Sequence, residues 1–301
     1  MKICTLGRTG LQVTQLGFGA MEIRGPRVWG GRPVTDAQAE TILNTVLDAG
    51  ITFIDTANDY GLSEERIGRF ISRRRDEYYL ATKCGCLLKD AGDHDETPHI
   101  WTHDNLLRGI NESLARMKTD YVDVLQLHNP SVEQVEQNGL VEALKEIQAS
   151  GKTRFIGISS TIPHIATFIK MGVFDTFQIP YSALDRAEED NMTKAAMAES
   201  GTIIRGGIAS GATSAEKQSG RRWAAWQKAK LDDLLNGMSR TEFILRFTLT
   251  HPHLHTTIVG TLNPAHLADN LKAAAEGPLP ADIYAAAKRR LTEAGERPAP
   301  A

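Results

Sequence analysis

The sequence predicts an α/β fold in which eight parallel β-strands close into a barrel with helices between them, a (β/α)8 or TIM barrel. Short apolar, β-prone segments alternate with helical patterns along 301 residues, and eight such strands can be counted. Eight βα units in one chain fit a closed barrel better than an open sheet. Three of the strands also end on an ionisable residue, as expected where parallel strands bring their carboxyl ends to one face. We find no domain boundary and expect one domain over residues 1–301.

The chain begins with a weakly alternating stretch, residues 2–14, which contains GRTG and predicts an N-terminal β-hairpin. Residues 16–20 are expected to form the first barrel strand, followed by a loop over residues 21–34. The segment GFGAME is not a dinucleotide-binding fingerprint, because Glu22 stands where G-x-G-x-x-G needs its third glycine. An open nucleotide-binding sheet therefore loses its main support.

The first helix is predicted over residues 36–48, because Thr35 and Gln38 form a capping box and Gly50 is a stop signal. The same alternation continues to the end of the chain. Further strands are expected at residues 51–54, 79–82, 122–127, 153–158, 176–179, 202–204 and 257–259, and further helices from Ser63, from Ser131 to near Gly151, after Ser239 and from Pro264. Residues 297–301 are expected to be a short frayed tail.

Composition excludes several classes of protein. A hydrophobic content of 41% without an apolar run of about 18 residues gives no membrane segment. A net charge of −3 with interspersed signs argues against a nucleic-acid partner. The N-terminus lacks the apolar core of a signal peptide, and three cysteines make no paired framework, so we expect a cytoplasmic protein. Nothing in the sequence indicates the oligomeric state.

Four ionisable residues follow the strands in a way that suits proton transfer. Asp55 ends one strand and Tyr60 lies in the loop after it, while Lys83 and His128 end two others. A phenol has a pKa near 10 and is a poor acid at neutral pH unless a cation stabilises its phenolate. Lys83 is the candidate cation, held by Asp55. Each residue alone has a structural alternative, such as a capping carboxylate or a histidine before a turn; the set of four favours chemistry.

The segments FIDTANDYGLSE, ATKCG and DVLQLHNP, with GRTGLQVTQLGFGAM before them and TTIVGTLNPAHLADN after them, resemble the aldo-keto reductase superfamily in order. The resemblance covers nearly the whole chain. It implies an NAD(P)H-dependent carbonyl reductase without a metal, in which Asp55, Tyr60, Lys83 and His128 are the catalytic tetrad and the hairpin plugs the barrel bottom. An alternative is a barrel of the same superfamily that binds NADP(H) as a sensor or regulatory subunit and turns over little.

The resemblance also implies a cofactor site. Its residues would be Gly19, Met21, Asp55, Ser159, Ser160, Gln178, Arg205, Gly206, Gly207, Ile208, Gly211, Gly260, Thr261, Asn263, His266 and Asn270. Two places depart from the family pattern. Ser160 replaces an asparagine, leaving two hydroxyls and Gln178 for the nicotinamide amide. Arg205 replaces a stacking tyrosine; its planar guanidinium can stack too, or it can be a salt-bridged arginine in a glycine-rich turn.

The choice of cofactor depends on the start of the last barrel helix. Asn263 as cap and Pro264 as first residue leave unpaired N–H groups that suit a phosphate. The family usually adds a lysine or arginine to this segment, but here only His266 can become cationic. We therefore expect NADP(H) to be preferred over NAD(H), by a factor that grows as pH falls and charges His266.

Two long loops, residues 84–102 and 206–238, are expected to shape a pocket for a small carbonyl substrate. Trp101 and Trp223 are candidate walls beside Tyr60 and His128. The alternative is that Trp223, with its neighbour three residues on, packs a short helix onto the barrel.

No metal site is expected from the cysteine and histidine patterns. Cys84 and Cys86 form a single C-x-C, without the second pair of a zinc site. The alternating histidines of HPHLH, residues 251–255, lie between a helix end and the eighth strand, on the face opposite the predicted chemistry.

Overall fold

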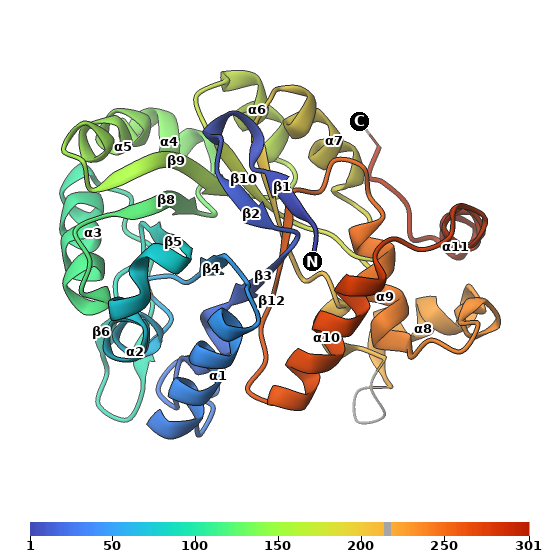
Figure 1. Cartoon of the computed structure of the whole chain (residues 1–301). Coiled ribbons are helices and arrows are strands. Elements are labelled where there is room, and N and C mark those ends of the chain that lie inside the picture. Colours follow the sequence, from blue (N-terminus) through green and yellow to red (C-terminus); the bar gives the residue numbers. More distant parts are fainter. Residues whose placement is uncertain (214–217, 301) are drawn as a thin grey trace.

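The structure is a computed structural model that describes residues 1–213 and 218–300. Within these residues eight strands close into a barrel in the order β10, β11, β12, β3, β4, β5, β8, β9 (Figure 1). Each strand pairs in parallel with both neighbours. The predicted TIM barrel is confirmed.

The barrel strands are β3 (Leu16–Gly19), β4 (Phe53–Asp55), β5 (Tyr79–Cys84), β8 (Val122–His128), β9 (Thr153–Ser159), β10 (Thr176–Pro180), β11 (Gly201–Arg205) and β12 (Thr256–Val259). The helices around them are α1 (Asp36–Asp48), α2 (Ser63–Phe70), α3 (His103–Met117), α4 (Val132–Gln137), α5 (Leu140–Ala149), α6 (Ile165–Met171), α7 (Glu189–Met197), α9 (Arg240–Leu249) and α10 (Pro264–Glu276). Their apolar faces and the outward side chains of the strands form the main core.

The N-terminal hairpin closes one end of the barrel. Its strands β1 (Ile3–Thr5) and β2 (Gln12–Thr14) pair antiparallel, and in Figure 1 they cross in front of the barrel. Leu6 is completely buried in a second apolar cluster with Phe53 and other side chains from the amino-terminal halves of the strands. Gly7 has a φ of +51°, and a Cβ there would lie 2.3 Å from the Gly201 amide nitrogen, so the hairpin reaches the barrel through a bare backbone.

Helix starts agree closely with the predicted caps. Thr35 and Gln38 form the capping box of α1, with side chain and backbone bonded in both directions. Ser131 opens α4 in the same way. These bonds satisfy amide groups that the first helical turn cannot pair internally, which is why a local sequence pattern was enough to locate them.

Two predicted elements are wrong in extent. The helix expected from Ser131 to near Gly151 is two helices, because Gly139 takes a φ of +57° and the chain turns there between α4 and α5. The expected frayed tail is held at Ala299, whose amide donates to the Ala187 carbonyl at 3.0 Å, and directly before the tail Arg186 donates to the Glu296 carbonyl at 2.9 Å. Residue 301 lies outside the described residues.

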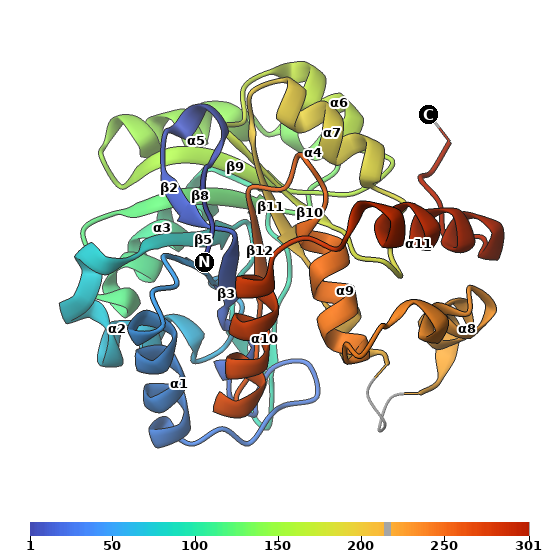
Figure 2. The ribbon, with the colours of Figure 1, turned by 45° about the vertical axis from the view of Figure 1, so that its right-hand side comes forward.

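The two long loops contain short elements of their own. Residues 84–102 include a two-stranded turn of β6 (Lys89–Asp90) and β7 (Asp95–Glu96). Residues 206–238 include α8 (Gly220–Lys228), although their part from 214 to 217 is outside the described residues. The C-terminal helix α11 (Ala281–Ala294) lies beside α8, as Figures 1 and 2 both show, and Lys228 donates to the Ala294 carbonyl at 3.0 Å.

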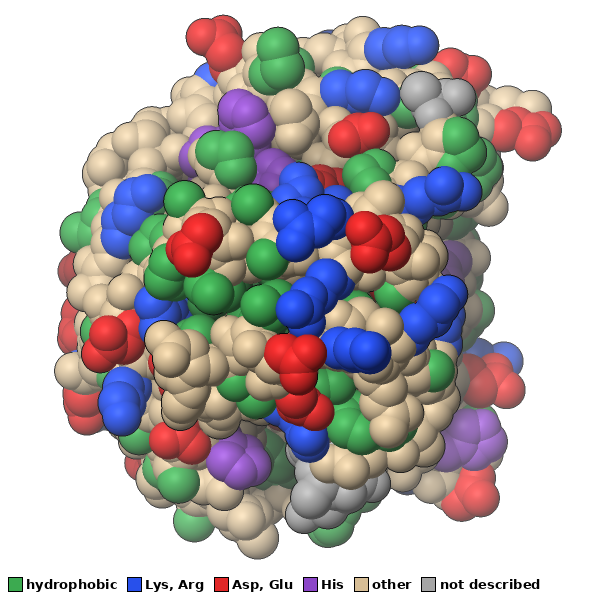
Figure 3. Space-filling view, turned by 90° about the vertical axis from the view of Figure 1, so that its right-hand side faces the viewer, with side chains coloured by type: hydrophobic (Ala, Val, Ile, Leu, Met, Phe, Trp, Pro, Cys, Tyr) green, Lys and Arg blue, Asp and Glu red, His purple; other side chains and the backbone are tan. Residues whose placement is uncertain are grey.

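The face that carries α8 and α11 has mixed charge. Lys and Arg side chains run down its middle with Asp and Glu side chains beside them (Figure 3). Ion pairs in this region include Arg221 with Asp185 at 2.8 Å and Arg290 with Asp233 at 3.2 Å. Among the described residues no helix combines the length and the hydropathy that crossing a bilayer requires.

Candidate active site

Adjacent parallel strands bring the four ionisable residues together. Asp55 is the last residue of β4, Lys83 lies near the end of β5 and His128 ends β8; these three strands are consecutive in the barrel. Tyr60 lies in the loop between β4 and α2. The four therefore meet at the carboxyl end of the barrel, opposite the hairpin.

The centre of the site is a buried ion pair. The Lys83 ammonium donates to Asp55 Oδ2 at 2.6 Å and to the Thr56 carbonyl at 2.9 Å, and the Lys83 and Asp55 side chains are 0% and 2% exposed. Asp55 Oδ1 accepts from the side-chain amides of Gln126, at 3.0 Å, and Gln178, at 2.7 Å. Burial opposes the charge on Lys83, but the Asp55 carboxylate and the Tyr60 phenol raise the pKa of Lys83 above its usual value. A cation is thus fixed under the loop that carries the phenol.

Tyr60 lies directly over this cation. Lys83 Nζ is 4.9 Å from the centroid of the Tyr60 ring, and the ring meets His128 edge to face at 6.0 Å between centroids. Burial raises the pKa of the Tyr60 phenol above its ordinary value; Lys83 opposes this rise, while Asp55 and Asp59 add to it. Lys83 acts on the phenol in the expected direction, because its charge favours the phenolate and offsets part of the effect of burial.

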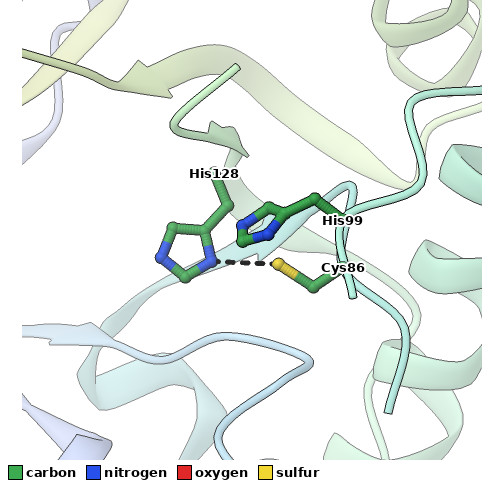
Figure 4. Close-up of side chains that lie close together, drawn as sticks. All are labelled: Cys86, His99 and His128. Carbon is green, nitrogen blue, oxygen red and sulfur yellow. Dashed lines mark hydrogen bonds between the residues drawn. The ribbon is translucent and has the colours of Figure 1, made fainter. Parts of the chain in front are cut away.

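Cys86 and Asp59 hold the His128 ring in place through its Nδ1 atom. Its Nδ1 lies 3.3 Å from Cys86 Sγ and 3.3 Å from Asp59 Oδ2, and its other nitrogen points away from Cys86 (Figure 4). Burial disfavours the charge on Asp59, but the hydrogen bonds of His128 and Cys86 and the charges of His128 and Lys83 hold the pKa of Asp59 below its usual range. The nitrogen of His128 that points away from Cys86 is consequently the one available for other contacts.

A cavity of about 1210 Å³ extends from Asp55, Tyr60 and His128 along the carboxyl end of the barrel. It is larger than the roughly 300–1,000 Å³ of a typical small-molecule site. Of the predicted cofactor residues it is lined by Gly19, Met21, Asp55, Ser159, Gln178, Arg205, Gly206, Gly207, Ile208, Gly211, Gly260, Thr261, Asn263, His266 and Asn270. Predicted cofactor residues from separate segments of the chain thus line one cavity.

Three predicted residues lie outside this lining. Ser160 is buried, and its hydroxyl donates to the Thr161 carbonyl at 3.5 Å. Trp101 is buried and packs at a tilt against His99, 5.6 Å between centroids. Trp223 lies under the guanidinium of Arg240 at 5.0 Å. The structure does not bring these three side chains to the cavity with the others.

The structure adds polar residues that sequence reasoning missed. Asn129 lines the cavity with a φ of +62°, and its Oδ1 accepts from the Ser159 hydroxyl at 3.3 Å. Lys272 and Arg32 bring two further cations to the same cavity, Arg32 in a 2.7 Å ion pair with Glu22. Asn129 directly follows a predicted strand-end histidine, so strand-end position alone was a signal for it.

Gln126 was detectable in a different way. It stands two residues before His128 on one strand, and alternate residues share a face, so its side chain had to point the same way as the predicted chemistry. Its 3.0 Å bond to Asp55 follows from that placement. Arg32 and Lys272 had no comparable signal, because neither stands at a strand end.

The start of α10 has the predicted form. Asn263 Oδ1 accepts from the Ala265 amide at 2.9 Å, and Pro264 is the first helical residue. Arg205, at the end of β11, is partly buried, with its Nε among the buried polar atoms that have no hydrogen-bond partner in the described chain. Burial lowers the pKa of Arg205, while the nearby acidic groups oppose that change. Arg205 therefore lines the cavity with its Nε–H unpaired.

This arrangement can be compared with known proteins. The sequence model of the aldo/keto reductase family matches residues 15–290. The chain belongs to this family. Membership makes it an oxidoreductase of the kind that reduces carbonyl compounds with nicotinamide cofactors.

Individual relatives are distant but cover most of the chain. The solved aldo-keto reductase AKR11C1 from Bacillus halodurans, in its holo form, is 27% identical with a TM-score of 0.85 over 96% of each chain. An uncharacterized oxidoreductase of Bacillus subtilis, YqkF, is 27% identical over 89% of this chain and 90% of its own. An NADH-specific methylglyoxal reductase of Escherichia coli is 30% identical over 64% of this chain and 62% of its own.

Proposed function

We propose that this aldo-keto reductase reduces the carbonyl group of a small aldehyde or ketone with NADPH, and that Tyr60 donates the proton. The observation that carries the proposal is the buried Lys83–Asp55 pair, 2.6 Å long, directly beneath a phenol at the head of the cavity. The Asp55 carboxylate favours the charged form of the buried Lys83, and a fixed ammonium group beside a phenol is suited to stabilise its phenolate.

The residues present fit a dinucleotide. The cavity is too large for a small carbonyl compound alone, and Gly206, where a Cβ would meet nothing within 4 Å, lines it without a side chain. The unpaired Nε of Arg205 offers a donor for stacking or for a phosphate oxygen. At the far end, the first turn of α10 supplies backbone N–H groups that suit an anion.

When bound, reduced nicotinamide supplies a hydride to the carbonyl carbon. Tyr60 gives its phenolic proton to the carbonyl oxygen, so the alcohol forms with no charged intermediate released. Lys83 stabilises the phenolate left behind, and Asp55 holds Lys83 in position. The nitrogen of His128 that points away from Cys86 donates a hydrogen bond to the carbonyl oxygen and orients it.

The nicotinamide amide would be held by Ser159, Asn129 and Gln178. Ser160, which the sequence placed in this group, lies outside the cavity lining, whereas Asn129 lines the cavity and bonds the Ser159 hydroxyl. Asn129 thus supplies the side-chain amide that position 160 lacks. Gln178 gives its N–H to Asp55, so its carbonyl oxygen is the atom suited to accept from the cofactor.

The proposed preference for NADPH rests on three cations. His266, Lys272 and Arg32 line the same cavity as the start of α10, although Asp269 and Glu22 lie among them. The NADH-specific relative from Escherichia coli shows that the opposite choice exists within the similarity range of this chain. We expect a moderate preference for NADPH, to which both Lys272 and His266 contribute.

The test is a stopped-flow experiment in which the NADPH-loaded protein is mixed with a panel of reactive aldehydes, ketones and sugar-derived carbonyls. Oxidation of NADPH within milliseconds to seconds for at least one compound supports a reductase. No oxidation across the panel, with tight NADPH binding, would instead identify a sensor or regulatory barrel. The same panel ranks the substrate classes.

A further inference from the structure

Three side chains that can bind a metal ion lie close together, and one of them is the candidate catalytic residue His128. The ligand atoms of Cys86, His99 and His128 all lie within 4.8 Å of one another (Figure 4). Cys86 Sγ and His128 Nδ1 are only 3.3 Å apart. In a tetrahedral zinc site, with Zn–S near 2.3 Å and Zn–N near 2.0 Å, sulfur and nitrogen ligands are roughly 3.5 Å apart. One edge of such a site therefore has its proper length already.

The backbone fixes Cys86 and His99 opposite each other. They form an isolated antiparallel bridge at the base of loop 87–98, so their side chains leave the same face. Two backbone hydrogen bonds flank the bridge: the Leu87 amide donates to the Pro98 carbonyl at 2.9 Å, and the Ile100 amide donates to the Gly85 carbonyl at 2.7 Å. Asn58 donates to the Cys86 carbonyl at 2.8 Å. The third ligand, His128, comes from the neighbouring strand β8, because β5 and β8 are paired up to this point.

Asp59 gives the cluster a negative charge. Its side chain is 1% exposed, its Oδ2 lies 3.3 Å from the same His128 nitrogen, and its Oδ1 has no hydrogen-bond partner in the described residues. An unpaired buried carboxylate oxygen is costly unless a cation or donor satisfies it. His99 is exposed, so an ion can enter from solvent on its side and the imidazole can rotate to close the site.

Cys84 is not part of this group. Its thiol turns to the opposite face of the strand, where it donates to the Gln126 carbonyl at 3.5 Å within the main core. The C-x-C sequence therefore does not act as a pair. The ligands come instead from three separate segments, which explains why cysteine spacing gave no sign of them.

We propose that Cys86, His99 and His128, with Asp59 beside them, bind a zinc-type divalent cation that switches the reductase off. Binding displaces the Cys86 thiol proton to solvent and places the thiolate, two imidazoles and the carboxylate on one ion. The Cys86–His128 edge already has its proper length, whereas other ligand atoms are up to 4.8 Å apart, so closing the site draws the His99 and His128 rings together and reorients His128 relative to Tyr60. A shift of about 1 Å at a group that positions substrate can cost about 10²-fold in rate.

The binding test uses Co²⁺ as a spectroscopic probe of the full chain, first treated with a chelator. The wild type should bind one equivalent and develop the thiolate-to-cobalt charge-transfer band in the near ultraviolet. Cys86→Ser should lose the band, and His99→Ala should weaken Co²⁺ and Zn²⁺ binding by at least the 10- to 100-fold that even outer-shell partners contribute. Near-ultraviolet circular dichroism and NADPH binding check that the variants are folded.

Three matched variants separate this site from adventitious binding. Cys84→Ser removes a buried thiol two residues away, Cys4→Ser removes the partly exposed thiol of the hairpin, and His94→Ala removes an exposed imidazole from the same loop. All three should keep the band and the affinity. A band that survives in Cys86→Ser, or that disappears in Cys4→Ser or Cys84→Ser, would overturn the site.

The inhibition arm alone rests on the proposed reductase function. The ratio of kcat/KM without and with one equivalent of Zn²⁺ should be large in the wild type and His94→Ala, and close to one in His99→Ala, with a chelator restoring activity. Stoichiometric binding with unchanged turnover would overturn the switch. A protein that binds the ion but reduces no carbonyl would count against the reductase, since the cobalt spectrum does not depend on turnover.

Discussion

At the scale of single residues, the site sets burial against charge. The same enclosure that makes Lys83 an effective partner for a phenolate also disfavours that phenolate. At Tyr60 the effect of burial is larger than the opposing effect of the Lys83 charge, so the pKa of the phenol lies above the ordinary value near 10. The consequence is that Tyr60 carries its proton throughout the neutral range, which suits the donor in carbonyl reduction.

This predicts opposite pH profiles for the two directions. Reduction needs the phenol, which is present below its raised pKa, so kcat/KM for reduction should be flat from about pH 6 to 9 and fall only above about 10. Alcohol oxidation needs the phenolate and should rise with pH over the same range. Both profiles can be measured with one aldehyde and its alcohol. A reduction profile that falls between pH 6 and 8 would mean that Tyr60 is more acidic than this environment allows, or is not the donor.

Arg205 provides a second residue-scale prediction. If its guanidinium stacks on the cofactor, Arg205→Ala should raise the Kd for NADPH, and Arg205→Tyr should recover much of the loss by restoring a flat ring. Fluorescence titration gives the three dissociation constants. Equal affinities would show that the Arg205 guanidinium does not stack on the cofactor.

The basic side chains of α10, Lys272 and His266, lead to a prediction about the preference for NADPH. Lys272→Ala and His266→Ala should each lower the ratio of kcat/KM for NADPH over NADH, because each removes a basic side chain from the cavity wall near the start of α10. The ratio is measured in wild type and both variants, with the exposed Lys118→Ala as control. A preference for NADH in the wild type would show that these cations do not hold the 2′-phosphate.

At the scale of elements, the hairpin and the site occupy opposite ends of the barrel. The hairpin contributes stability without touching the chemistry. Leu6→Ala should therefore lower the free energy of unfolding by about 2–5 kcal/mol, the usual range for a buried leucine. Its kcat/KM should be unchanged where both proteins are folded. Ile3→Ala, at a side chain 59% exposed on β1, is the control and should change little. Lost turnover with normal stability in Leu6→Ala would show that the hairpin couples to the site.

The elements also show what could be predicted from sequence. Caps are local, so the capping boxes at Thr35 and Ser131 located helix starts correctly. The sequence does not predict the break at Gly139, because an apolar pattern continues across it. The bridge between Cys86 and His99 joins residues thirteen positions apart in a loop without periodicity, and no local signal records such a pairing.

At the scale of the whole molecule, closure of the barrel is what turns separate strand ends into one site. The order β4, β5, β8 makes Asp55, Lys83 and His128 neighbours although they are far apart in sequence. Motif order predicted this meeting because parallel strands share one carboxyl face. It could not predict the partners supplied from other directions, such as Asp59 behind His128 or Lys272 across the cavity, which depend on how loops and helices close over the barrel.

The most direct test of the account is single-turnover reduction by Tyr60→Phe. This variant keeps the ring over Lys83 and removes only the oxygen that carries the proton. NADPH affinity should stay within about twofold of wild type, while the rate of NADPH oxidation on mixing with a good aldehyde substrate should fall by about 10²- to 10⁴-fold, the usual effect of losing a positioned general acid. Near-normal oxidation by the folded, NADPH-bound variant would contradict the assignment of Tyr60 as the proton donor.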